Sequence, residues 1–105
     1  MRLADVVTRT PVVACAAAPD QRVYLKLENL QPAGSFKLRP IGNAILSRPR
    51  SALSSGVHTY SSGNSALAMT WMAKRIGIAA TAVVPEGAAE SIWRSEERRV
   101  GKECR

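Results

Sequence analysis

A lysine stands among small and polar residues in the stretch Gly34-Ser35-Phe36-Lys37-Leu38-Arg39, where we expect a helix to begin. A cation in the first turn of a helix is repelled by the positive end of the helix dipole. That repulsion, together with burial, would favour the uncharged amine, which is the form that condenses with an aldehyde. Lys37 is therefore a candidate for covalent catalysis. From spacing alone, the plainer interpretation is an exposed lysine beside Arg39.

A second cluster, Ser61-Ser62-Gly63-Asn64-Ser65, also stands where a strand should pass into a helix. Gly63 permits a tight turn and a close approach of the backbone to a ligand. The hydroxyls of Ser61, Ser62 and Ser65 and the amide of Asn64 could hold a carboxylate. The alternative from spacing alone is a capped helix start that binds no ligand.

The surrounding sequence alternates between strand-like and helix-like segments. We expect strands at 23–27, 57–61 and 79–84, and helices at 35–47, at 65–76 and from 88 to 93. Ser35 is the expected N-cap of the first helix, and Gly77 ends the second. This order predicts an α/β fold in which helices flank a parallel sheet. Both polar clusters would then lie beyond strand ends, where such sheets bind ligands.

Two linked stretches resemble a known family. Residues 25–39, LKLENLQPAGSFKLR, resemble the cofactor-lysine motif of fold-type II pyridoxal-phosphate enzymes. Residues 61–64, SSGN, resemble the asparagine loop of the serine/threonine dehydratase (ammonia-lyase) and serine racemase branch. Residues 73–78 and 82–86 resemble the helix and strand that follow that loop. The resemblance extends over about residues 10–89.

The resemblance implies a truncated fold-type II (tryptophan synthase β-like) fold and an N-terminal fragment of a longer enzyme. Residues 1–50 would be the N-terminal part of the large cofactor-binding domain, and 51–93 the first half of the small α/β domain. The parent enzyme would be a homodimer or a higher homo-oligomer. The fragment alone should be inactive, because the family's glycine-rich phosphate cradle would lie further along the sequence.

Roles for individual residues follow from the same resemblance. Lys37 would hold pyridoxal 5'-phosphate as a Schiff base and move the substrate's α-proton. Phe36 would pack against the cofactor ring, and Asn64 would hydrogen-bond the ring oxygen. Residues 61–65 would bind the carboxylate of an amino-acid substrate. Ser62 matches the position that carries the second base in serine racemases, and no metal ligand is implied.

The implied activity is β-elimination of L-serine or L-threonine to a 2-oxo acid and ammonia. Leu38, directly after the lysine, favours this dehydratase branch. Because of Ser62, racemisation of an amino acid remains an alternative activity. A non-catalytic α/β binding module is the alternative outside the enzymes. Pro40 replaces a common glycine, and Ser65 replaces the usual histidine of the loop, so the choice between serine and threonine also stays open.

Residues 94–105, RSEERRVGKECR, change abruptly in composition from the segment before them. In one reading frame, a widely used short-read sequencing adapter encodes this stretch. We therefore expect a non-native tail there and exclude it from the prediction of the fold.

Composition and charge argue against several other classes of protein. The net charge of +7 invites a nucleic-acid-binding interpretation, but the charges are scattered and aromatic residues make up only 5% of the chain. No apolar run approaches the roughly 20 residues that span a bilayer. Charged residues and Pro11 interrupt the apolar N-terminal patches, so we expect a cytoplasmic protein without a secretory signal. Cys15 and Cys104 show no spacing typical of a disulfide framework or a zinc site.

Overall fold

The computed structural model describes residues 2–17, 21–61 and 63–84. Its strands are β1 (Val12–Ala14), β2 (Tyr24–Lys26), β3 (Val57–Tyr60) and β4 (Ala80–Val83). Its α-helices are α1 (Leu38–Leu46) and α2 (Asn64–Ile76), and short 3₁₀ turns occur at Glu28–Leu30 and Arg50–Leu53. The expected helix at 88–93 and the tail at 94–105 lie outside the described residues.

The predicted parallel pairing is confirmed for β3 and β4. Val57 lies opposite Ala80 and Tyr60 lies opposite Val83, with α2 as the crossover between the strands. The strand predicted at 23–27 does not join the parallel sheet. It forms β2, which pairs antiparallel with β1, a strand that the sequence did not predict. The connection at 15–23 is too short for a parallel crossover, which needs about a dozen residues or more.

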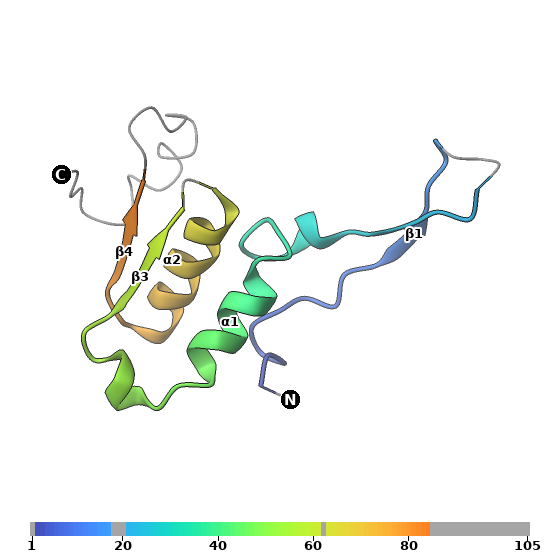
Figure 1. Cartoon of the computed structure of the whole chain (residues 1–105). Coiled ribbons are helices and arrows are strands. Elements are labelled where there is room, and N and C mark those ends of the chain that lie inside the picture. Colours follow the sequence, from blue (N-terminus) through green and yellow to red (C-terminus); the bar gives the residue numbers. More distant parts are fainter. Residues whose placement is uncertain (1, 18–20, 62, 85–105) are drawn as a thin grey trace.

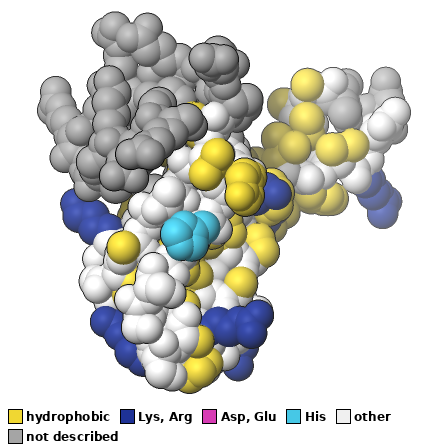
Figure 2. Space-filling view, turned by 60° about the vertical axis from the view of Figure 1, so that its left-hand side comes forward, with side chains coloured by type: hydrophobic (Ala, Val, Ile, Leu, Met, Phe, Trp, Pro, Cys, Tyr) yellow, Lys and Arg dark blue, Asp and Glu magenta, His cyan; other side chains and the backbone are white. Residues whose placement is uncertain are grey.

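The body of the fold has three layers. In Figure 1, α2 lies between the β3–β4 sheet on one side and α1 on the other, while the β1–β2 hairpin extends away as an arm. Along β3, Val57 and Thr59 are half-buried, whereas His58 and Tyr60 are exposed. Figure 2 shows a histidine side chain open to solvent, with Lys and Arg side chains towards the borders of the view. Among the described residues, α2 covers one face of the sheet and no helix or strand covers the other.

One hydrophobic cluster joins α1, α2 and the N-terminal segment. Leu38 and Met72 are its fully buried members, and Val6, Ile45 and Leu53 complete its buried part. Leu38 directly follows Lys37, so the residue after the candidate lysine anchors the start of α1 in the core. The cluster includes residues on both sides of position 50, and the division into two domains there stays a prediction.

The first helix begins later than the sequence suggested. Ser35 was expected as its N-cap, but α1 starts at Leu38 and Lys37 occupies the cap position without a side-chain cap bond. Pro40 gives the physical reason. In a helix capped by Ser35, Pro40 would have to donate an amide hydrogen that it lacks, whereas a start at Leu38 places it in the first turn, where amides have no helical partner.

The second helix agrees closely with prediction. It ends at Ile76, and Gly77 follows in the left-handed conformation with φ 69°, as expected of a glycine after a helix C-terminus. Among the described residues, no helix combines the length and the apolar character that a membrane span requires.

Candidate active site

Lys37 lies at the start of α1 with a half-buried side chain. Its backbone amide donates to Ser35 Oγ over 3.4 Å, and its carbonyl accepts from the amide of Ile41 over 3.2 Å. Its Nζ lies 5.0 Å from the centroid of the Phe36 ring, which is itself 54% exposed. Within the described part of the chain, this cation–π contact is the only interaction of the amine, so no carboxylate holds it as an ion pair.

The second cluster forms the turn between β3 and α2. The amide of Gly63 donates to Ser61 Oγ over 3.2 Å, and the Gly63 carbonyl accepts from the amides of Ala66 and Leu67. Asn64 is exposed at the first position of α2. Ser62 lies outside the described residues, so its expected role stays a prediction.

The start of α2 is open to an anionic ligand. Gly63 is the N-cap and makes no side-chain cap bond, and the first turn contains no acidic residue. Among the described residues, no group accepts a hydrogen bond from the backbone amides of Asn64 and Ser65. Free amides at a helix N-terminus favour a negatively charged group. The expected capped start, the alternative to a ligand site, is therefore not formed by the described side chains.

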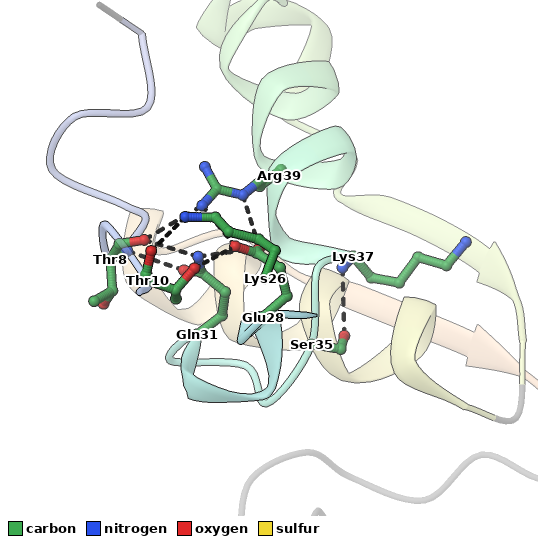
Figure 3. Close-up of polar contacts among 8 residues, drawn as sticks. All are labelled: Thr8, Thr10, Lys26, Glu28, Gln31, Ser35, Lys37 and Arg39. Carbon is green, nitrogen blue, oxygen red and sulfur yellow. Dashed lines mark hydrogen bonds and ion pairs between the residues drawn. The ribbon is translucent and has the colours of Figure 1, made fainter. Parts of the chain in front are cut away.

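The two clusters lie at the same end of the fold. Figure 1 shows that α1 and α2 both begin at the end where β3 and β4 finish. In Figure 3, the side chain of Lys37 extends away from Glu28 and Arg39, in the direction in which the strands of the parallel sheet point. The structure thus brings the lysine and the serine-asparagine turn to one edge, as the strand-to-helix argument requires.

A further polar cluster, which the sequence did not reveal, lies on the opposite side of the start of α1. The carboxylate of Glu28 accepts two hydrogen bonds from Arg39, at 2.7 Å and 2.8 Å, and one from Thr10 Oγ1 at 2.6 Å. Gln31 Nε2 adds a fourth, at 3.2 Å. We call these four residues the Glu28 cluster. The sequence offered one hint, since the motif at 25–39 contains Glu28 near its start and the oppositely charged Arg39 at its end.

The cluster keeps the carboxylate of Glu28 ionised. The hydrogen bonds from Arg39, followed by that from Thr10, lower the pKa of Glu28 from 4.5 to about 2. The same ion pair raises the pKa of Arg39 above its ordinary value. Glu28 is therefore an acceptor at neutral pH and cannot supply a proton to chemistry at the site.

A lysine amine without an ion pair to any described residue, at the same end of the fold as a helix start whose first amides have no described acceptor, fits a cofactor that carries an aldehyde and a substrate that carries a carboxylate. Apart from the adjoining chain, no described residue has an atom within 4 Å of the point where a side chain at Gly63 would begin, so a ring and its substituents could approach there. The described residues thus fit the aldehyde and ring of such a group.

Comparison with known proteins agrees with this geometry. The family model described as "Pyridoxal-phosphate dependent enzyme" matches residues 3–101. The chain belongs to this family, whose cofactor is pyridoxal 5'-phosphate. The match runs into the tail predicted at 94–105, and the origin of that tail stays a prediction.

Relatives in the family have two kinds of activity in their names. The chain is 35% identical over 97 residues to the mitochondrial threonine dehydratase of Schizosaccharomyces pombe, covering 90% of the chain and 16% of that protein. It is 39% identical over 90 residues to the serine racemase of Dictyostelium discoideum, covering 83% of the chain and 28% of that protein. It superposes on maize serine racemase with a TM-score of 0.86 and 36% identity, covering 96% of the chain and 32% of that structure. The chain thus spans from about a sixth to about a third of these relatives.

Proposed function

We propose that this chain is the cofactor-lysine segment of a longer ammonia-lyase, which converts L-serine or L-threonine to a 2-oxo acid and ammonia. The single observation that carries the proposal is the placement of Lys37 at the start of α1, at the end of the fold where α2 also begins, with no ion pair from any described residue. The threonine dehydratase and the serine racemase among its relatives support the same class of substrate.

Within this proposal, each site residue has a physical task. Lys37 holds the cofactor through Nζ and moves the α-proton of the substrate. Phe36 covers the ring, and Asn64 donates to the ring oxygen. The backbone amides of Asn64 and Ser65, which have no acceptor among the described residues, orient the substrate carboxylate together with the hydroxyls of Ser61 and Ser65. Pyridoxal phosphate, when bound, supplies an electron sink for the negative charge that develops at the α-carbon.

An amino-acid racemase is the second candidate. Its reaction would need an additional proton-transferring residue from the β3–α2 turn. Racemisation requires a proton donor on each face of the substrate's α-carbon, and elimination does not. Ser62 is the residue assigned to the second face. A Ser62→Ala variant should therefore lose racemisation and keep elimination if both activities are present.

The attachment of the cofactor can be tested directly. The chain, extended to the length of its relatives, should be incubated with pyridoxal phosphate, reduced with borohydride, digested and analysed by mass spectrometry. We expect the modification on Lys37, and its loss in Lys37→Ala. Lys74→Ala is the matched control, because Lys74 is exposed in the last turn of α2, far from the β3–α2 turn.

The reaction is tested by measuring 2-oxo acid and D-amino acid formed from L-serine and L-threonine. Formation of the 2-oxo acid supports the lyase, and D-amino acid without 2-oxo acid supports the racemase instead. An unmodified Lys37 in a folded protein would contradict both and favour the non-catalytic binding module.

A further inference from the structure

The loop that carries Lys37 is closed at both ends by one ion pair. Glu28 lies two residues after the end of β2 and Arg39 lies in the first turn of α1, with the loop and its lysine between them. Arg39 Nε and Nη2 donate to Glu28 Oε2 and Oε1 over 2.7 Å and 2.8 Å. Such a two-point pair fixes orientation as well as distance, because both partners are planar.

The carboxylate of Glu28 has no free acceptor site left. Each oxygen accepts twice: Oε1 from Thr10 and Arg39, and Oε2 from Arg39 and Gln31. An ionised carboxylate offers about four acceptor positions, so all of them are used. The Glu28 side chain is only 15% exposed. This saturation keeps the carboxylate from turning to another cation, and it explains why its pKa lies near 2.

The same cluster is tied to the N-terminal segment. The Gln31 side chain is 3% exposed; its Oε1 accepts from the amide of Thr8 over 2.9 Å, and its Nε2 donates to the carbonyl of Thr8 over 2.8 Å. Lys26 Nζ donates to the carbonyl of Thr10. Segments that are distant in sequence therefore hold the loop from one side, as Figure 3 shows.

The position of Arg39 determines where Lys37 points. Residues two apart on a helix project in nearly opposite directions, because each residue turns the chain by about 100°. Lys37 has helical backbone angles, φ −58° and ψ −23°, so this relation holds between it and Arg39. With Arg39 held towards Glu28, Lys37 must extend to the other side, which is the direction seen in Figure 3.

We propose that the Glu28–Arg39 pair is a positioning device, which turns the first helical turn of α1 so that the amine of Lys37 faces the β3–α2 turn. The proposal rests on the function proposed above for Lys37, and it assigns Glu28 and Arg39 no contact with cofactor or substrate. The pair acts through the backbone of residues 37–39. Its loss should misdirect the amine without unfolding the layers of α1, α2 and the sheet, because Leu38 still anchors the helix in the core.

The test uses Glu28→Gln, Arg39→Gln, Arg39→Lys and the double variant Glu28→Gln/Arg39→Gln in the protein extended to the length of its relatives. Two quantities are measured with pyridoxal phosphate: its affinity, and the ratio of visible circular dichroism to absorbance. The ratio reports how rigidly the bound group is oriented, which a general loss of stability in a still-folded protein does not change.

We expect each Gln variant to lower affinity about tenfold, the size associated with losing charge-assisted hydrogen bonds, and to reduce the ratio. The double variant should be no worse than either single one, because the two residues act as one unit. Arg39→Lys should resemble Arg39→Gln, since lysine cannot form the two-point pair. Unchanged affinity and ratio in the Gln variants would overturn the proposal, and so would additive losses in the double variant.

The matched control is Arg75→Gln. Arg75 also binds the N-terminal segment, donating to the carbonyl of Asp5 over 2.7 Å, but it lies in the last turn of α2 and stacks on Trp71. Its loss should leave the dichroism ratio unchanged.

A cofactor-free measurement separates this proposal from the proposed function. Hydrogen exchange of the backbone at 35–39 should be about tenfold faster in Arg39→Gln than in the parent, and unchanged in Arg75→Gln. If Lys37 of the parent takes up no cofactor, the proposed function fails, while this exchange result still shows whether the pair fixes the loop. Equal exchange rates in the parent and in Arg39→Gln would overturn the positioning role.

Discussion

Arg39 donates a hydrogen bond to each carboxylate oxygen of Glu28, and the two residues lie at opposite ends of the loop that contains Lys37. No side chain caps α1, and the pair connects its first turn to the other end of the loop. Pro40 determines where this helix begins, whereas the long-range contact ties its first turn to the segment that follows β2. The contact also makes the start of α1 sensitive to pH.

Acid should weaken the fold through Glu28. Its folded pKa of about 2 lies below the ordinary value of 4.5, so folding favours the ionised form. The resulting stabilisation is complete above the unfolded pKa and is lost as pH falls towards the folded pKa. The difference in unfolding free energy between the parent and Glu28→Gln should therefore shrink between about pH 5 and about pH 2, as measured by urea unfolding. A pH-independent difference would contradict this account.

Gly56 should be hard to replace. It has φ +85°, and a Cβ there would lie 2.7 Å from the carbonyl oxygen of Ala79, on the backbone next to β4. Gly77 has a similar φ of +69°, but a Cβ there meets nothing within 4 Å among the described residues. Both Gly→Ala variants incur about 1–2 kcal/mol for the left-handed conformation. Gly56→Ala should lose clearly more stability than Gly77→Ala in thermal unfolding, and equal losses would refute the steric argument.

Leu38→Ala should destabilise the protein by about 2–5 kcal/mol, because it empties a fully buried site between α1 and α2. Leu30→Ala is the control at a side chain that is 52% exposed, and it should cost much less. The comparison uses chemical unfolding of both variants. Similar losses at the two positions would mean that Leu38 does not anchor α1.

Gln31→Ala should cost about 1–3 kcal/mol, because it leaves the amide and carbonyl of Thr8 without the partners that the buried side chain provides. Gln21→Ala, at an exposed residue beside β2, should be nearly neutral. Thermal unfolding of the two variants provides the measurement. A neutral Gln31→Ala would show that water replaces the amide without loss.

Much of the local structure follows from neighbouring residues. The helix predicted at 65–76 and the strands predicted at 57–61 and 79–84 appear within about one residue of the observed elements, and Gly77 ends α2 as expected. Periodic burial and a glycine stop act over a few residues, so they can be predicted without knowing the chain path. The predicted start of α1 was wrong, because the prediction underestimated the effect of Pro40, which cannot donate a backbone hydrogen bond.

The sequence by itself determined the two candidate clusters, the parallel pair of strands and the family, because each depends on residue types at fixed short spacings. The tertiary structure alone decided that β2 pairs with β1, that Glu28 is saturated by Arg39, Thr10 and Gln31, and that Lys37 points the other way. These contacts join positions far apart in sequence. Their side-chain directions depend on how the loop folds back, and nearest-neighbour preferences carry no information about that path.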